Sequence, residues 1–210
     1  MAAPRSTEPG DVHNQIVREA SRLIAARGFD GMSLQDIADA VGVSKPAVLH
    51  HFPSKEHIRV AVLEDVLAHW RETLPRLLMA VSAGEGRFDA IFGELQRFFR
   101  ENPDRAKILV RENLDRPEET RKLLRGPVRP WLSAVAGSIK TGEAEGRVHA
   151  DLDAEAYVLL ALQMVIFTSA LGPVVTIAIS EGAEGGERYY REAARMAKSA
   201  LFPPRSNRSR

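Results

Sequence analysis

The chain of 210 residues contains no cysteine, which excludes a disulfide-stapled scaffold and a zinc site with cysteine ligands. Its histidines do not replace the missing thiols. His69 and His149 stand alone, without a second metal ligand at the usual spacing. We therefore expect no metal and no other cofactor, and the absence of thiols fits a cytoplasmic protein.

An excess of charge of one sign is also missing. The 29 Lys and Arg residues are balanced by 28 Asp and Glu residues, for a formal net charge of +1. No field over the whole chain therefore favours nucleic acid or a membrane surface, although a local basic patch is compatible with this balance. The 44% hydrophobic and 27% charged residues are typical of a globular protein.

No segment alternates apolar and polar residues over a strand length, and no internal repeat or low-complexity tract occurs. The sequence therefore predicts an all-α fold. It also lacks an HExxH motif, a glycine-rich phosphate loop after a strand and a serine elbow. These absences argue against an enzyme, and a helical small-molecule enzyme is kept as an alternative.

One long apolar run does occur. Tyr157–Ile179 holds 23 residues without a charge, enough in length to span a bilayer. Polar residues such as Gln163 interrupt it, Gly172-Pro173 is expected to break it, and it is preceded by Asp153 rather than a basic anchor. We interpret it as a helix buried on most faces, not as a membrane span. The first residues, MAAPRSTEPGDV, contain no apolar run, so no signal peptide is expected.

Capping signals near the N-terminus predict two short helices. Ser33 caps a helix that ends before Gly42, whose backbone can take a left-handed turn. Ser44 caps the next helix, with Pro46 in its first turn, where a missing N–H costs nothing. Two short helices joined by a turn of about three residues with a glycine are typical of a helix-turn-helix motif.

Further helices are expected on both sides of the motif, separated by breaks at glycine and proline. Pro75 is expected to kink the first long one. The expected ranges are 11–28, 54–81, 87–101, 103–114, 117–124, 127–145, 153–179 and 185–201.

The stretch DGMSLQDIADAVGVSKPAVLHHFPSKEHI resembles the DNA-binding domain of the TetR family of bacterial transcriptional regulators, and IKTGEAEGRVHADLDAEA looks like the run before the family's penultimate helix. The resemblance implies a homodimeric repressor that a small molecule releases from a palindromic DNA operator. It implies a three-helix helix-turn-helix DNA-binding domain (11–55) and a larger helical ligand-binding and dimerisation domain (56–202), between a disordered arm (1–10) and a disordered tail (203–210). An architectural DNA-binding protein without an effector is the alternative from another class.

The resemblance implies that the second helix of the motif reads the major groove. Lys45 can donate to guanine O6 and N7, and Pro46 and Ala47 offer apolar contact to thymine methyls. This chain has Leu49 where the family usually has an aromatic residue and Ala47 where it has threonine, so two hydroxyls are missing. Up to and including Lys55, six basic residues balance six acidic ones, so we expect modest non-specific affinity. The residues expected to bind DNA, with Ser33, His51 and Lys55 on phosphates, are Ser33, Gln35, Ser44, Lys45, Pro46, Ala47, Leu49, His50, His51 and Lys55.

Bulky apolar residues in the larger domain suit a pocket for an apolar, drug-sized effector, although each also suits an ordinary helical core. Glu112 interrupts the run ILVRENL and is either a polar ligand of the effector or a surface or interhelix group. No charge pattern identifies the effector. The residues assigned to the pocket are Trp70, Leu74, Phe88, Phe92, Glu112, Trp131, Met164 and Phe167.

The helix expected over 153–179 is too apolar to have a solvated face, and the helix over 185–201 carries small alanines on one side. Two such helices from each subunit would form the four-helix, apolar interface of an obligate homodimer. The residues assigned to this interface are Leu162, Ile166, Ser169, Tyr189, Ala193 and Ala197.

Overall fold

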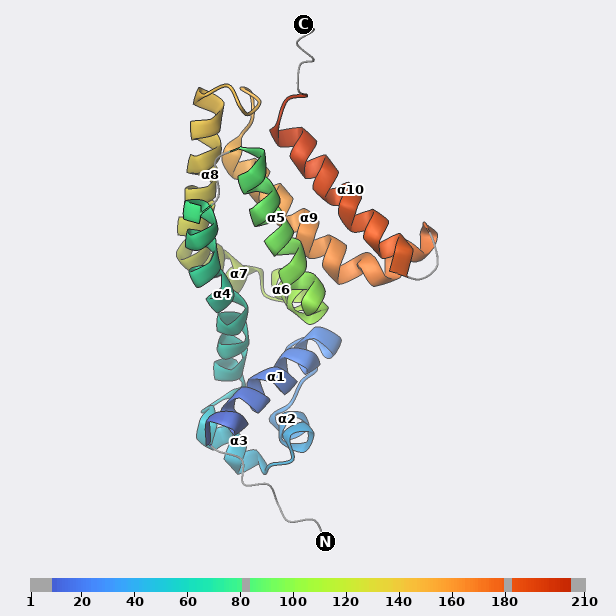
Figure 1. Cartoon of the computed structure of the whole chain (residues 1–210). Helices are drawn as coiled ribbons and strands as arrows, with labels where there is room; N and C mark the ends of the chain where they lie inside the picture. Colours follow the sequence, from blue (N-terminus) through green and yellow to red (C-terminus); the bar gives the residue numbers. More distant parts are fainter. Residues whose placement is uncertain (1–8, 81–83, 180–182, 205–210) are drawn as a thin grey trace, which may run out of the picture. The chain divides into compact units, whose positions relative to one another are not determined.

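The structure, a computed structural model, describes residues 9–80, 84–179 and 183–204. Within these ranges the chain is helical and contains no strand, which confirms the all-α fold (Figure 1). The chain divides into two compact units, residues 1–71 and 72–210. The predicted arm and tail lie mostly outside the described residues, and the domain limits at 55 and 56 stay a prediction.

The first unit contains α1 (Pro9–Arg27), α2 (Leu34–Val41), α3 (Lys45–His51) and the first part of α4 (Lys55–Ala80). Helix α2 packs on α1 and α3 packs on α2. Each helix contributes apolar side chains with no exposed surface, so the unit has a core of its own. These side chains are Ile16, Ala20, Ile37, Ala38, Val48 and Ile58.

The second unit is built around α9 (Ala154–Val175), which packs against four other helices. The four are α5 (Glu85–Glu101), α6 (Pro103–Asp115), α8 (Arg129–Ala144) and α10 (Ala183–Leu201). Shorter pieces complete the unit: α7 (Pro117–Leu123), the π-helical turn η1 (Leu124–Val128) and the 3-10 turn η2 (Thr176–Ala178).

Two of these starts follow simple capping rules. The Asn102 side chain accepts a hydrogen bond from the backbone N–H of Asp104 at 3.2 Å, and Pro103 occupies the first helical position of α6. The Asp153 carboxylate accepts from the N–H of Ala156 at 3.0 Å at the start of α9. Both helices therefore begin where a side chain satisfies a backbone donor that the helix itself leaves unpaired.

Prolines inside the longer helices do not end them. Helix α4 continues through Pro75 to Ala80. The predicted break at Gly172-Pro173 is wrong, because α9 continues to Val175 and η2 follows directly. There the Thr176 hydroxyl donates to the Gly172 carbonyl at 2.7 Å and ties the last turn together. Tertiary packing of α9 on its neighbours outweighs the loss of one helical hydrogen bond at a proline.

The segment before α8 is also helical, although the sequence predicts a break between the helices over 117–124 and 127–145. A turn of π-helix joins α7 to α8, and Gly126 inside it has a non-helical backbone with φ −91° and ψ −105°. Pro127 follows it within the same turn. The chain therefore changes direction at Gly126 while the helical hydrogen bonding on each side is kept.

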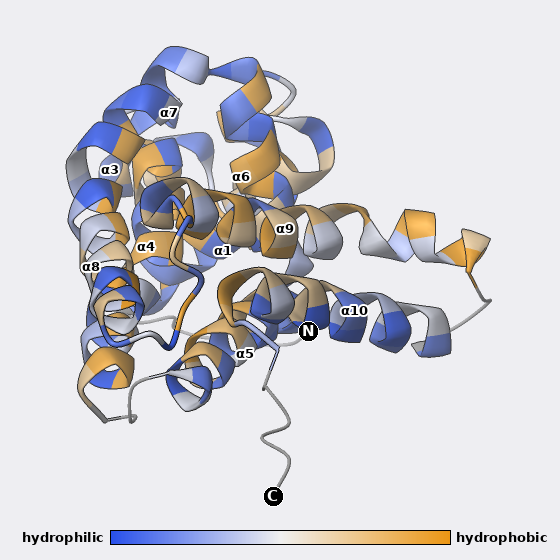
Figure 2. Ribbon diagram, turned by 90° about the horizontal axis from the view of Figure 1, so that it is seen from above, coloured by the Kyte–Doolittle hydropathy of each residue, from blue (hydrophilic) through white to orange (hydrophobic). Residues whose placement is uncertain are grey.

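Helix α9 carries more apolar surface than its own unit covers. Figure 2 shows hydrophobic residues along α9 and in the turn after it. By length and composition Ala154–Ala178 is apolar enough to cross a membrane, with a mean hydropathy of 2.1, and only 28% of the most apolar stretch is buried. The exposed large apolar residues here are Leu160, Phe167, Leu171, Val174, Val175, Ile177 and Ile179. The residues that the structure describes leave this apolar surface open to solvent.

Candidate nucleic-acid interface

The start of α2 is fixed by a reciprocal pair of hydrogen bonds. The Ser33 hydroxyl accepts from the backbone N–H of Asp36 at 3.1 Å, and the Asp36 carboxylate accepts from the backbone N–H of Ser33 at 2.8 Å. The Ser33 hydroxyl also donates to the Asp36 carboxylate. This bond, the bond from the Ser33 backbone N–H and a smaller contribution from the nearby Arg27 lower the pKa of the Asp36 carboxyl. The Ser33 cap predicted from the sequence is confirmed, and Asp36 completes it as a capping box.

The end of α2 depends on a glycine. Gly42 has φ 79°, in the left-handed region, and its N–H donates to the Ala38 carbonyl at 2.9 Å. The N–H of Val43 donates to the same carbonyl at 2.9 Å. Ala38 and Ile37 are buried, so the turn is held against the core. A side chain on residue 42 would strain this conformation, which explains the glycine in the turn.

Helix α3 begins at a serine cap and turns one apolar residue inward. The Ser44 hydroxyl accepts from the backbone N–H of Ala47 at 3.3 Å, and Pro46 lies in the first turn, as predicted. Val48 is fully buried, and its carbonyl accepts from the N–H of the buried Phe52 at 2.9 Å. Val48 and Phe52 therefore fix which face of α3 points to the core.

The opposite face of α3 is open. Lys45, Pro46, Leu49 and His50 are exposed, while Ala47 and His51 are half-buried. Four of the seven residues of α3 thus provide a positive charge, apolar surface and an imidazole on one side of a helix of two turns. A helix with this diameter and these groups fits the major groove of B-DNA, which admits an α-helix.

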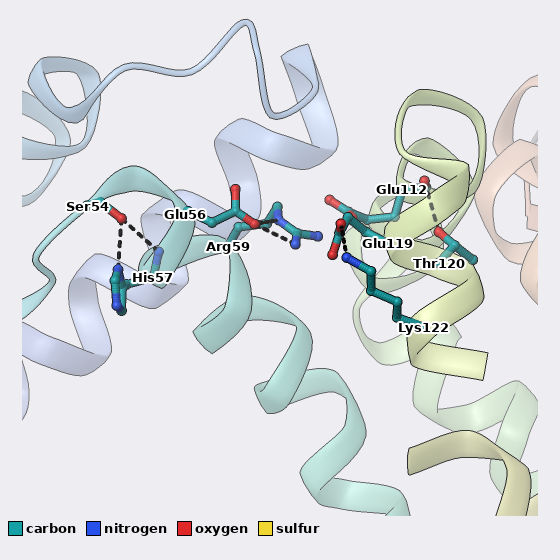
Figure 3. A network of polar contacts seen from close by, with 8 residues as sticks. All are labelled: Ser54, Glu56, His57, Arg59, Glu112, Glu119, Thr120 and Lys122. Carbon is teal, nitrogen blue, oxygen red and sulfur yellow. Dashed lines mark hydrogen bonds and ion pairs between the residues drawn. The ribbon is translucent and has the colours of Figure 1, made fainter. Parts of the chain in front are cut away.

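Lys55 at the start of α4 is held by the turn between α1 and α2. Its ammonium lies 4.4 Å from the centroid of the Phe29 ring and 3.5 Å from the Asp30 carbonyl oxygen. Beside it, the Ser54 hydroxyl lies 2.8 Å from Nδ1 of His57 and accepts from the His57 backbone N–H at 3.4 Å (Figure 3). Lys55 therefore has a structural role in addition to its predicted contact with phosphate.

The histidines of the motif form a small aromatic group with α1. The His13 ring stacks on Phe52 with centroids 4.5 Å apart and lies edge-on to His51 at 6.3 Å. His50 and His51 are 5.7 Å apart. Within the residues that the structure describes, no group of three His, Cys, Asp or Glu side chains is placed to hold a metal ion. Sequence reasoning missed His13, since its spacing from the motif gives no local signal.

Gln35 differs from the other predicted base readers. Its amide donates to the Asp39 carboxylate at 2.7 Å, one turn further along α2. A contact with a base edge would require this side chain to leave Asp39. Of the predicted DNA-binding residues, Lys45, Pro46, Leu49 and His50 are already exposed on one short helix, whereas Ser33, Gln35, Ser44 and Lys55 have partners in the protein.

The predicted pocket residues differ in burial. Phe88 and Phe92 stack with ring centroids 5.1 Å apart, and Phe88 packs against the buried cluster of Ala136, Ile139, Val148, Ala154 and Leu201. Leu74 and Glu112 are buried, Trp131 and Met164 are half-buried, and Phe167 is exposed. Trp70 is buried and belongs to the first unit. Their common role as a pocket stays a prediction.

The residues assigned to the dimer interface fall into two groups. Leu162, Ile166 and Tyr189 are half-buried, whereas Ser169, Ala193 and Ala197 are buried inside the protomer. The alanines pack within the second unit, and the Ala197 carbonyl accepts from the Tyr157 hydroxyl at 2.8 Å. Burial raises the pKa of that hydroxyl. The exposed apolar residues at the end of α9 and in η2 offer a larger uncovered surface, which helical periodicity alone did not identify.

Known proteins are similar in sequence to the helix-turn-helix segment of this chain. The model of the bacterial regulatory proteins of the tetR family matches residues 16–62, from α1 into α4. The transcriptional repressor KstR2 of Mycolicibacterium smegmatis is 33% identical over 67 residues, which cover 32% of this chain and 33% of the relative. The transcriptional repressor NicS of Pseudomonas putida is 21% identical over 168 residues, 79% of each chain. The chain thus matches about a third of the length of KstR2 and most of NicS.

Solved structures share the fold over a longer span. A TetR-family regulator from Agrobacterium tumefaciens aligns with a TM-score of 0.72 at 19% identity, covering 93% of this chain and 100% of the other. AibR, solved in complex with isovaleryl coenzyme A and operator DNA, gives a TM-score of 0.72 at 19% identity and covers 92% and 99%. The similarity in fold therefore extends over the second unit as well as the first.

Proposed function

Because this chain belongs to the TetR family of bacterial transcriptional regulators, we propose that it is a homodimeric repressor that leaves a palindromic DNA operator when a small molecule binds. One observation carries the proposal: a seven-residue helix with an exposed lysine, proline, leucine and histidine is held by its buried face in a unit that matches the family model.

Helix α3 reads base edges in this proposal. Lys45 donates to guanine, and Pro46 and Ala47 lie near thymine methyl groups. Ser33, His51 and Lys55 approach phosphates on either side and set the register without reading sequence. The hydroxyl of Ser44 accepts a backbone N–H and can still donate its own proton to DNA, whereas the Ser33 hydroxyl donates to the Asp36 carboxylate and would have to leave it to reach a phosphate.

The second unit binds the effector in this proposal. Support comes from the fold shared with AibR, whose structure holds isovaleryl coenzyme A, and with a regulator from Saccharomonospora viridis in complex with choline. These two ligands differ in size and charge, so they do not define the effector of this chain. Phe88, Phe92 and Trp131 supply apolar surface for it.

The homodimer is formed by the exposed apolar residues of α9 and η2 in this proposal. A surface that includes Leu171, Val174 and Ile177 is costly to leave in water, and a two-fold axis covers the same patch on both protomers. The dimer then presents two α3 helices to the two halves of one operator. The protein acts in the cytoplasm, where the chromosome is accessible, and is not an enzyme.

Selection of bound duplexes from random DNA, followed by sequencing, tests the function. We expect a palindromic site with half-sites about 34–36 Å apart, or a multiple of that distance. A thermal-shift screen of small molecules then separates a ligand-responsive repressor from an architectural protein, which only DNA would stabilise. Failure to enrich any sequence would contradict the proposal.

A further inference from the structure

Leu49 is an exposed side chain of α3 that can make only apolar contacts. It is 38% exposed, although the next residue toward the core, Val48, is fully buried. It carries no donor or acceptor, so it cannot hydrogen-bond to a phosphate or to a base edge. If α3 enters the major groove, as in the function proposed above, this leucine must contact apolar surface or leave that part of the interface empty.

The major groove offers one prominent apolar group, the C5 methyl of thymine. The other groups that distinguish the base pairs there are hydrogen-bond donors and acceptors, which leucine would desolvate without compensation. We propose that Leu49 determines operator specificity by packing on a C5 methyl group in each half-site. Since leucine does not read the hydrogen-bonding edge, it accepts 5-methylcytosine as well as thymine at that position.

The position of Lys45 restricts where this methyl group lies. Lys45 and Leu49 are one helical turn apart on the same side of α3, so their Cβ atoms are about 5–6 Å from each other. Successive base pairs are separated by about 3.4 Å. The methyl group read by Leu49 therefore lies one or two base pairs from the guanine that Lys45 contacts.

The test uses the full-length protein and the duplex obtained by selection from random DNA. Each thymine of one half-site is replaced in turn by deoxyuridine, which removes the methyl group and keeps the base pair. We expect one or two positions at which the Kd of the wild-type protein rises about 3- to 10-fold, the effect of losing one buried methyl contact. At those positions the Kd of the Leu49→Ala variant should be the same on the thymine duplex and on the deoxyuridine duplex.

Cytosine at the same position provides the converse test. Methylation of that cytosine at C5 should tighten binding of the wild-type protein by a similar factor. The same methylation should not change the Kd of the Leu49→Ala variant. Leu49→Met, which keeps an apolar side chain of similar reach, should retain the methyl effect. Thermal melting of both variants checks that the fold survives, as expected for an exposed position.

Two results would overturn the inference. One is an operator in which every thymine tolerates deoxyuridine. The other is a methyl effect of equal size in wild type and Leu49→Ala, which would assign the contact to a neighbour such as Pro46. Both differ from a failure of the proposed function, in which no duplex would be enriched at all.

Discussion

At the scale of single residues, the two lysines of the first unit have different surroundings. Lys45 is exposed on α3, whereas Lys55 contacts the Phe29 ring and the Asp30 carbonyl. Lys45→Ala should cost about 1–3 kcal/mol of binding on the selected operator and relax base preference at one position per half-site. Titrations on the operator and on variants of each base pair measure this.

Lys55→Ala should weaken binding to all sequences. It should also reduce the slope of log K against log salt concentration by about one unit. It should also lower the melting temperature of the free protein, because the cation–π contact with Phe29 is lost. Lys45→Ala, at an exposed position without such a contact, serves as the control for stability. Interchangeable effects of the two substitutions would contradict the roles given to them.

Ser169 gives a prediction about stability. Its side chain has no exposed surface, and its hydroxyl has no hydrogen-bond partner among the residues that the structure describes. A buried polar group without a partner destabilises the folded state, so Ser169→Ala should raise the free energy of unfolding by about 1 kcal/mol. Thr168→Val is the matched control, because the Thr168 hydroxyl does donate to the Met164 carbonyl at 2.8 Å. Thr168→Val should lower the free energy of unfolding in chemical denaturation, and a Ser169→Ala variant that also lowers it would contradict this.

At the scale of elements, the capping box of α2 makes stability depend on pH. The folded-state pKa of Asp36 lies below its usual value of 3.8. Its stabilising effect is therefore complete above that value and is lost as the pH falls through the lower, folded-state pKa. We expect the wild-type protein to have a higher melting temperature than the Asp36→Asn variant at neutral pH. This difference in melting temperature should shrink as the pH falls from roughly 5 to 2. A difference in melting temperature that stays constant across that pH range would show that the ionised Asp36 carboxylate does not stabilise the start of α2.

The short elements were easier to predict than the long ones. Ser33, Gly42, Ser44 and Pro46 each act through neighbours in the sequence, so local rules placed α2 and α3 to within about a residue. The break at Gly172-Pro173 was wrong, because the packing of α9 on four helices is a tertiary effect that no local rule contains. The apolar residues of α9 also lie on every side, so periodicity could not tell which of them the protomer buries.

The same limit applies to the candidate sites. The exposed residues of α3 followed from a recognisable motif, whereas the contact of Lys55 with Phe29 joins residues far apart in the sequence. The burial of Ala197 within the protomer likewise depends on how α10 packs on its neighbours. A charge placed at Ala197, one of the residues that the sequence assigns to the dimer interface, would therefore test the fold of the protomer instead.

At the scale of the whole molecule, a better test of the dimer uses a residue that the protomer leaves exposed. Ile177 in η2 is 72% exposed, so Ile177→Glu should leave the protomer folded. In the dimer that we propose, the carboxylate would be buried without a partner, and dissociation should follow together with loss of operator binding. Analytical ultracentrifugation and a gel-shift assay measure the two effects.

Leu114→Glu is the matched control, because Leu114 on α6 is also 72% exposed and lies outside the apolar surface of α9. It should stay dimeric and bind DNA. An Ile177→Glu protein that sediments as a dimer and still binds the operator would place the interface elsewhere.

The apolar surface of α9 also has a consequence for biosynthesis. In the dimer that we propose, this surface has no cover in a newly translated chain until a second chain arrives. During that interval the surface is open to chaperones and to aggregation. Chains made from one messenger RNA are released close together, which shortens the interval. The yield of active protein should therefore depend on how densely ribosomes load the message, and not only on how many messages the cell contains.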